Sequence, residues 1–259
     1  MAIFTADDFG LSESVNEAVE LAHEGGILTA ASLMVGAPAS ADAVRRARRL
    51  PKLGVGLHVT VVNGVPVLPP ESVPDLVDRK GRFTSRLVAA GVRSFFNRSV
   101  RRQLEAEITA QFDAFARTGL RLDHVDAQNH MHVHPTIFGM VLRIGRRYGL
   151  RAVRIPREPG GPLFLAPWLT LMRLRARRAG VMTNRTIFGL RDSGKMSVER
   201  VVRLLGRLRR GINEVYFHPA TQGPDVVEFD ALMSPAVREA LVKREVVATT
   251  YGALLEERG

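Results

Sequence analysis

Short apolar runs alternate with helix-forming segments along most of the chain, and this alternation limits the fold more than any other feature. Each run is rich in residues that suit buried strands, and the segments between them space their apolar residues at helical intervals. Strands that alternate with helices form mostly parallel sheets, so we predict an α/β protein. The expected strands cover residues 2–6, 29–35, 54–62, the segment from Leu122, 152–155, 185–190, 214–218 and 246–250.

The length of 259 residues suits a single α/β barrel, and neither a linker nor a low-complexity tract interrupts the sequence. We therefore expect one domain over residues 1–259. Residues 63–97 form the least regular part, rich in proline and glycine, and are expected to be a long excursion over one face. A strand at 246–250 and a short helix at 253–258 are expected to end the chain.

The composition is compatible with a reducing compartment. There are no cysteines, which excludes disulfides and thiolate metal sites. The first ten residues lack the basic region of a secretory signal, and no apolar run is long enough to cross a bilayer. We expect a cytoplasmic protein.

The formal net charge of +11 comes mainly from arginine and suggests an anionic partner, although an arginine-biased composition gives the same value. Residues 162–179 run from an apolar half with Trp168 into a half with four arginines. Such a segment is either an interfacial helix, in peripheral contact with the inner membrane face, or a packing helix with a basic end. Aromatic residues make up only 6%, and no nucleic-acid module is present, so we expect no nucleic-acid partner. A homodimer is expected.

Four of the seven histidines fall between Leu122 and Pro135. If this segment is a strand, residues 124, 126, 128 and 130 share one face. A face with two histidines, an aspartate and a glutamine fills a hydrophobic core poorly but suits a metal or proton-transfer site. The alternative is a solvated loop with incidental histidines.

Other candidate residues lie at or near the ends of predicted strands: Asp7, Asp8, His58 and His218. In a (β/α) barrel the carboxyl ends of the strands surround the active site, so these residues would meet there. Carboxylates with imidazoles suit magnesium, manganese, zinc, nickel or cobalt, and one aspartate could act as general base. Each residue also has a structural alternative: a helix-capping pair, a core histidine or the end of a strand.

The motifs TADDFG at 5–10, GLHVT at 56–60, DxxxHMH at 126–132 and FHPA at 217–220 resemble those of the YdjC-like carbohydrate deacetylases, which include the chitooligosaccharide deacetylase. The resemblance runs through nearly the whole chain. Further residues are similar to the hopanoid-biosynthesis-associated branch: Trp168, Asn184, Gly189, Leu190, Ser193–Gly194–Lys195–Met196 and Glu214.

The resemblance implies an irregular (β/α) barrel that removes an N-acetyl group from an amino sugar with one divalent metal ion, magnesium or zinc. Asp7 would be the base, Asp8 and His58 metal ligands, and His218 the acid or a substrate contact. The hopanoid branch would place the sugar on a glycolipid.

The chain departs from the family pattern at Gln128, where the third histidine ligand is expected. A carboxamide oxygen is a weaker ligand than imidazole for a transition metal. Three outcomes are open: Gln128 coordinates weakly, His130 replaces it, or the site is impaired and the protein only binds a sugar or lipid headgroup.

Overall fold

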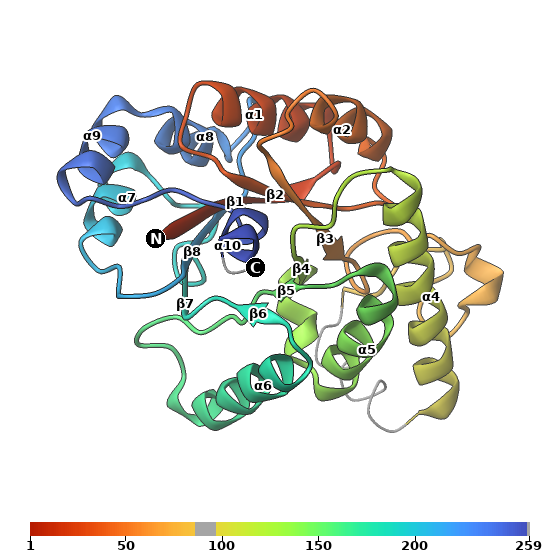
Figure 1. Cartoon of the computed structure of the whole chain (residues 1–259). Coiled ribbons are helices and arrows are strands. Elements are labelled where there is room, and N and C mark those ends of the chain that lie inside the picture. Colours follow the sequence, from red (N-terminus) through yellow and green to blue (C-terminus); the bar gives the residue numbers. More distant parts are fainter. Residues whose placement is uncertain (86–96, 258–259) are drawn as a thin grey trace.

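The protein is described by a computed structural model, which covers residues 1–85 and 97–257. Eight strands form one curled sheet in the order β6-β5-β4-β3-β2-β1-β8-β7, and all seven pairings are parallel (Figure 1). The predicted parallel α/β fold and irregular barrel are therefore confirmed. The strands are β1 Ala2–Phe9, β2 Ala30–Leu33, β3 Gly54–Val59, β4 Val125–Ala127, β5 Ala152–Val153, β6 Met182–Thr183, β7 Thr186–Phe188 and β8 Asn213–Phe217.

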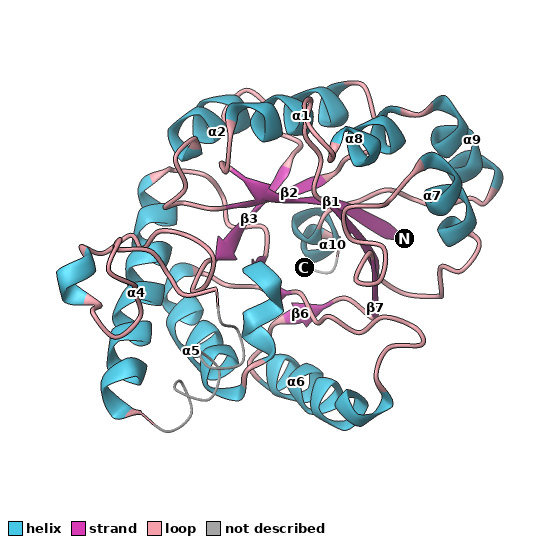
Figure 2. Ribbon diagram, turned by 180° about the vertical axis from the view of Figure 1, so that it is seen from behind, coloured by secondary structure: helices cyan, strands magenta, loops and turns pink. Residues whose placement is uncertain are grey.

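Helices surround the outer face of the sheet, as the views from both sides show (Figures 1 and 2). The α-helices are α1 Glu13–Glu24, α2 Ser40–Ala47, α4 Arg98–Arg117, α5 Pro135–Gly145, α6 Ala166–Arg178, α7 Val198–Leu205, α8 Val226–Met233, α9 Pro235–Lys243 and α10 Tyr251–Glu256. The described residues also contain the short 3-10 turns η1 Pro70–Ser72, η2 Gln128–Val133, η3 Arg146–Tyr148 and η4 Leu163–Leu165.

Two details of the predicted strand set are wrong. Residues 246–250 do not form a strand but contribute an isolated bridge between Ala248 and Ala2. Strand β8 covers one edge of β1 from Ala2, and β2 covers the other edge from Thr5, so only the first residues of β1 are left to pair. The edge strand β6 was not anticipated, since two residues are too short to give a hydrophobic pattern. Within the described residues β6 and β7 do not pair, which leaves the barrel open between them.

The core has two parts on opposite faces of the sheet. Outward-facing residues such as Phe4 and Leu57 pack in the large cluster shared with the helices. At the amino ends of the strands, Ile3 and Ala152 pack with Tyr251 of α10. Helix α10 therefore covers that end of the barrel, near its centre in Figure 1, and leaves the carboxyl ends for polar side chains.

The predicted excursion at 63–97 is tied to α4 over its described part. Glu107 accepts hydrogen bonds from the backbone N–H groups of Val67 and Leu68, at 2.8 and 3.0 Å. Residues 86–96 of this segment, and residue 258 of the predicted final helix, lie outside the described residues. Among the described helices, none combines the length and apolarity needed to cross a membrane.

Candidate active site and metal centre

Asp7 and Asp8 lie at the carboxyl end of β1, where the strand departs from regular pairing between Ala6 and Phe9. Neighbouring side chains on a regular strand point to opposite faces, which would turn Asp8 towards the helices. Asp8 instead has a φ of 61°, in the left-handed region that few non-glycine residues adopt. With this conformation its carboxylate lies beside His58, so both aspartates belong to the same site.

His58 sits in β3, opposite Asp126 of β4 in the parallel register. Its Nδ1 lies 2.8 Å from Asp126 Oδ1, and its Nε2 lies 3.4 Å from Asp8 Oδ1. Burial by itself lowers the pKa of His58, but the carboxylates of Asp126, Asp8 and Asp7 together outweigh burial and raise that pKa well above its ordinary value. Asp126 therefore fixes the ring and leaves Nε2 facing Asp8.

A buried guanidinium, that of Arg154, holds three carboxylates together. It makes a bidentate pair with Asp7, with Nη1–Oδ2 at 2.7 Å and Nη2–Oδ1 at 2.8 Å. Nη1 lies 2.6 Å from Asp126 Oδ2, and Nε donates to Glu214 Oε1 at 2.9 Å. The guanidinium carbon also lies 5.2 Å from the centre of the Tyr216 ring. Arg154 therefore fixes the orientation of the Asp7 carboxylate.

The carboxylates paired with Arg154 differ in their pKa. Burial raises the pKa of Asp7, and Arg154 offsets this only in part. Burial also acts on Asp126, but Arg154 and His58 together bring the pKa of Asp126 well below its usual value. Asp7 is consequently the more basic of the two groups.

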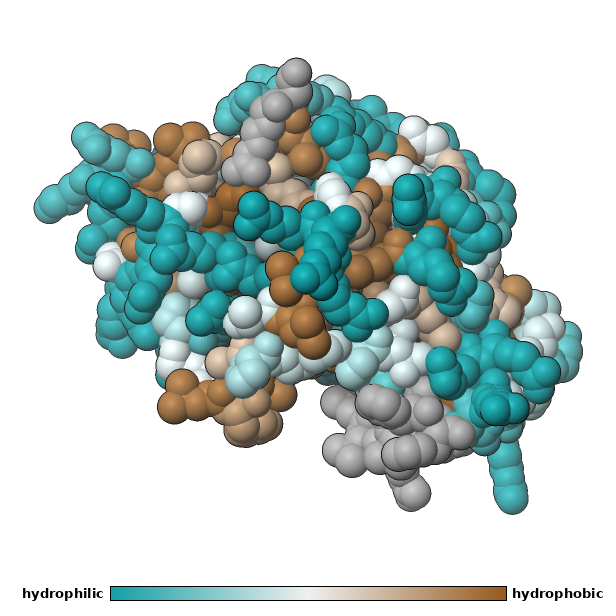
Figure 3. Space-filling view, turned by 60° about the horizontal axis from the view of Figure 1, so that its bottom comes forward, coloured by the Kyte–Doolittle hydropathy of each residue, from teal (hydrophilic) through white to brown (hydrophobic). Residues whose placement is uncertain are grey.

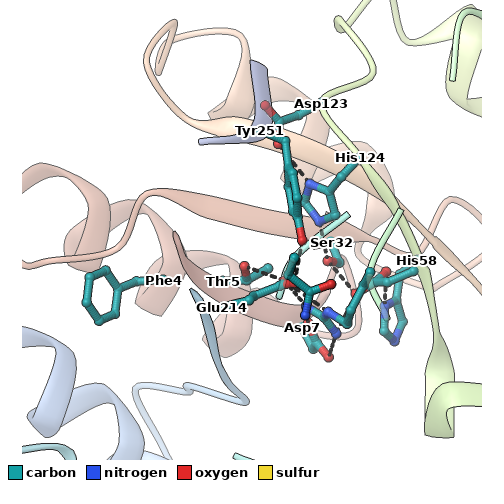
Figure 4. A network of polar contacts seen from close by, with 12 residues as sticks. Phe4, Thr5, Asp7, Ser32, His58, Asp123, His124, Glu214 and Tyr251 are labelled. Carbon is teal, nitrogen blue, oxygen red and sulfur yellow. Dashed lines mark hydrogen bonds and ion pairs between the residues drawn. The ribbon is translucent and has the colours of Figure 1, made fainter. Parts of the chain in front are cut away.

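A second row of polar groups runs from α10 to the same site (Figure 4). Gly252 N donates to Asp123 Oδ1 at 2.6 Å, and Asp123 Oδ2 lies 2.9 Å from His124 Nδ1. His124 Nε2 lies 3.1 Å from Ser32 Oγ, which donates to Asp126 Oδ2 at 2.9 Å. The carboxylate of Asp126 is therefore supported from the closed end of the barrel.

Tyr251, the first residue of α10, supports Glu214. Its hydroxyl donates to Glu214 Oε2 at 2.8 Å, and Thr5 Oγ1 donates to Oε1 at 2.9 Å (Figure 4). Glu214, Thr5 and Tyr251 are all fully buried. The ion pairs of Arg154 with Asp7, Asp126 and Glu214, which we call the Arg154 clamp, are thus themselves supported by hydrogen bonds to Glu214.

The histidine segment is a strand for only three residues, and the expectation that residues 124–130 share one face is wrong. β4 ends at Ala127, and Asn129 and His130 have positive φ values of 49° and 52°. Two successive left-handed residues end the alternation of a strand, so Gln128 and His130 are placed by the turn.

The four histidines of this segment have different environments. His124 belongs to the buried row of polar groups. His132 Nε2 lies 2.9 Å from the Arg154 carbonyl, and burial lowers the pKa of His132 to about 4. His134 caps α5 by accepting from Thr136 N at 3.3 Å. His132 and His134 therefore have structural partners.

Gln128 and His130 each leave a buried atom without a hydrogen bond from the described part of the chain: Gln128 Oε1 and His130 Nδ1. Gln128 Nε2 donates to Asn63 O at 3.4 Å. The His130 ring packs edge-on against Tyr216, with centroids 5.4 Å apart. Burial and the charge of Arg154 bring the pKa of His130 well below its usual value, so this imidazole is neutral.

His218 follows β8 and is partly exposed. Its Nδ1 lies 3.4 Å from Ser193 Oγ, and its backbone N–H donates to Glu228 Oε2 at 2.6 Å. Burial raises the pKa of Asp8, but His58 and His218 outweigh it, and the net shift is downward. The His218 ring also packs edge-on against Tyr216, with centroids 5.5 Å apart, and His130 and Arg154 contact the same Tyr216 ring, so His218 borders the same site.

The donor atoms of Asp7, His58 and Asp126 lie within 4.8 Å of one another and could surround a metal ion. Arg154, however, already pairs with both carboxylates, and Asp126 occupies His58 Nδ1. The atoms left for a cation are His58 Nε2 and Asp8 Oδ1, which is buried and accepts no well-formed hydrogen bond from the described residues. Tetrahedral ligands about 2.1 Å from zinc lie roughly 3.4 Å apart, and this pair is separated by 3.4 Å. The donor set fits a divalent ion beside Asp8.

Sequence reasoning placed Asp7, Asp8, His58 and His218 together, and the structure brings all four to the carboxyl ends of the strands. It missed Arg154, which directly follows β5 and lies inside the predicted strand 152–155, and it did not assign a site role to Glu214 or Ser32. An arginine inside the otherwise apolar run 152–155 was the available signal, because a buried charge requires partners.

Comparisons with known proteins show the family of the chain. The family model described as YdjC-like protein matches residues 1–243. A carbohydrate deacetylase of Brevibacillus brevis is 32% identical over 222 residues, covering 84% of this chain and 80% of that protein. A carbohydrate deacetylase of Geobacillus stearothermophilus is 39% identical over 158 residues, covering 60% of each chain.

Solved structures share the fold. A crystal structure from Enterococcus faecalis V583, of a protein provisionally named for cellobiose-phosphate cleavage, has a TM-score of 0.80 and 27% identity, covering 98% of both chains. A lactam utilization protein from Thermus thermophilus, 14% identical, has a TM-score of 0.52 and covers 96% of this chain and 99% of that chain. The second likeness concerns the fold alone.

Proposed function

Because the chain belongs to the YdjC-like protein family, we propose that it is a metal-dependent hydrolase that removes the N-acetyl group from an acetylated amino sugar. The observation that carries this proposal is the division between two neighbouring aspartates. Asp7 is clamped by Arg154, whereas Asp8 faces the free nitrogen of His58. One carboxylate is thereby kept for proton transfer and the other for a cation.

We assign Asp8, His58 and Gln128 as ligands of one divalent ion, magnesium or zinc. Asp126 holds Nδ1 of His58, so that Nε2 points to the cation. Gln128 would contribute its buried Oε1, and His130, whose imidazole is neutral, is the neighbouring nitrogen ligand. When bound, the ion supplies Lewis acidity to the acetyl carbonyl and lowers the pKa of a bound water.

Asp7 and His218 would carry the proton transfers. Asp7 takes the proton of the attacking water, and Arg154 keeps the carboxylate oriented while burial keeps it basic. His218, partly exposed near Asp8, donates a proton to the departing amine nitrogen. The amide C–N bond breaks, and acetate and a free amino sugar are released.

We propose further that the sugar is carried on a lipid, as in the hopanoid-associated branch, and that the enzyme works peripherally at a membrane face. Support comes from the residues of the carboxyl half that resemble the hopanoid-associated branch, and from the exposed apolar side chains of η4 and α6. Soluble oligosaccharides of N-acetylglucosamine would then serve as poorer substrates that still report the chemistry.

The test is acetate release from N-acetylglucosamine oligomers, measured after EDTA treatment and after readdition of magnesium, zinc, manganese or cobalt. We expect no release with EDTA and recovery with at least one ion. A Glu105→Gln variant, which loses a carboxylate that pairs with Arg143 between α4 and α5 and leaves every proposed site residue in place, is the control. Release that EDTA does not affect, or no release with any ion, contradicts the proposal.

A second function is supported by Gln128: an impaired enzyme that retains sugar or lipid-headgroup binding. A protein of this kind would bind the oligomers by calorimetry without releasing acetate. It would gain activity when Gln128→His restores the expected imidazole.

A further inference from the structure

Helix α6 carries apolar side chains on two opposite sides. Leu169, Met172 and Ala176 are buried against the barrel. On the opposite side Leu171 and Leu174 are 43% and 42% exposed. A helix on the surface of a soluble domain ordinarily has a polar outer face, so the outward apolar side chains of α6 require a partner.

The turn before α6 adds the two most exposed large apolar side chains of the described residues, Leu163 at 85% and Phe164 at 80%. Leu171 and Leu174, three residues apart, share one face of α6, and Phe164 belongs to the turn η4 directly before it. The turn is held in place because Leu165 N donates to Pro162 O at 3.1 Å and Trp168 Nε1 donates to Val133 O at 2.8 Å. We call Leu163, Phe164, Leu171 and Leu174 the apolar face of α6.

Arginines surround a groove of about 650 Å³ that begins beside this face. One carboxylate, that of Glu158, and five guanidinium groups line the groove. None of these five guanidinium groups forms an ion pair with a carboxylate of the described residues. Burial and the charges of Arg157 and Arg185 lower the pKa of Arg173, so these cations repel one another. The five arginines are Arg157, Arg173, Arg185, Arg191 and Arg209.

The groove borders the candidate active site. Glu158 lies in the loop after β5, and Gly189 and Arg191 lie in the loop after β7. The Glu158 carboxylate accepts hydrogen bonds from the backbone N–H groups of Gly189 and Arg191, at 3.2 and 3.1 Å, and so connects these two loops. The second loop continues to Ser193, whose hydroxyl lies 3.4 Å from His218 Nδ1. A molecule bound at the groove would therefore lie next to the proposed acid.

We propose that the apolar face of α6 and the arginine groove dock onto an anionic lipid bilayer. Leu163 and Phe164 enter the interfacial region, and the guanidinium groups contact lipid phosphates. Figure 3, with the underside of the view in Figure 1 brought forward, shows apolar patches interleaved with hydrophilic side chains. Apolar side chains beside unpaired cations complement the two layers of such a surface, acyl chains and phosphates. The proposal rests on the proposed function in that docking would present a lipid-borne sugar to the site.

The test is sedimentation of the full chain with vesicles, in the absence of any sugar substrate. Vesicles of phosphatidylcholine alone are compared with vesicles containing equal parts of phosphatidylcholine and phosphatidylglycerol. One variant, Leu163→Ser with Phe164→Ser, removes the apolar turn, and its control is Val242→Ser with Val247→Ser, which are 74% and 60% exposed elsewhere. A second variant, Arg157→Gln with Arg185→Gln, is matched by Arg45→Gln with Arg121→Gln.

We expect binding to the anionic vesicles, weaker binding to the neutral ones, and a fall of about tenfold or more in the partition coefficient for each groove or turn variant. The matched controls should bind like the wild type, and thermal unfolding checks that each variant is folded. Three results would overturn the proposal: no binding by the wild type, full binding by the serine turn variant, or an equal loss in the controls. The acetate assay with soluble oligomers tests the proposed function separately, because it contains no vesicles.

Discussion

Arg154 and Asp7 form a bidentate ion pair inside the barrel, with nitrogen–oxygen distances of 2.7 and 2.8 Å and both side chains withdrawn from solvent. The two residues are 147 positions apart in the sequence. The pair fixes a carboxylate whose pKa burial raises, next to a second carboxylate, Asp8, that faces His58. This contact connects the stability of the barrel to the proposed chemistry.

Replacing Arg154 by methionine should lower the free energy of unfolding by about 3–5 kcal/mol, because Asp7, Asp126 and Glu214 would lose their buried partner. Urea unfolding measures the change. Arg121→Met is the control, since its pair with Glu256 is exposed and should cost less than about 1 kcal/mol. Similar losses in both variants would show that the clamp has no special role in stability.

Asp7→Asn should reduce kcat for acetate release by roughly 10²- to 10⁴-fold, because the amide cannot accept the proton of the attacking water. Metal binding, measured by calorimetry, should remain, since Asp7 is not among the assigned ligands. Loss of metal binding in Asp7→Asn together with retention in Asp8→Asn would reverse the two assignments.

Gln128→His should tighten the binding of zinc by at least about tenfold, because imidazole is a better zinc ligand than a carboxamide oxygen. Asn129→His introduces the same group one residue away, at an exposed position, and should leave zinc affinity near that of the wild type. Equal affinities for wild type and Gln128→His would place the third ligand elsewhere, with His130 the nearest candidate.

The buried pair of Asp123 and His124 should make stability depend on pH. For Asp123, burial raises the pKa, but the interactions with His124 outweigh burial and the net pKa is lowered. The contribution of Asp123 to stability is therefore complete above its pKa in the unfolded chain and is lost as pH falls through its pKa in the folded protein. For His124, burial lowers the pKa, but Asp123 outweighs burial and the net pKa is raised. The contribution of His124 to stability is complete below its pKa in the unfolded chain and is lost as pH rises through its pKa in the folded protein. The pair should therefore stabilise most between about pH 4 and 6.5.

Thermal unfolding of wild type and His124→Gln across this range measures the effect. The difference in Tm should be largest near the middle of the window and should shrink in alkaline buffer. Two curves that stay parallel from acid to alkaline pH would contradict the expected linkage.

The amino-acid sequence by itself determined the parallel α/β architecture, because alternation of apolar runs and helical spacing is a local property of the chain. It also located Asp7, Asp8, His58 and His218, since strand ends can be recognised from the same pattern and the carboxyl ends of parallel strands meet at one edge. The prediction of a strand at 246–250 was wrong because the pairing of this segment depends on which strands already flank β1.

Only the tertiary structure decided how these residues divide their roles. The left-handed backbone of Asp8 and of His130 breaks the alternation that a sequence pattern assumes, so neither side chain could be assigned to a face beforehand. The partners of Arg154 come from β1, β4 and β8, and their approach follows from the register and curl of the whole sheet. Contacts between such distant segments depend on how the whole sheet curls, which no local preference of the chain specifies.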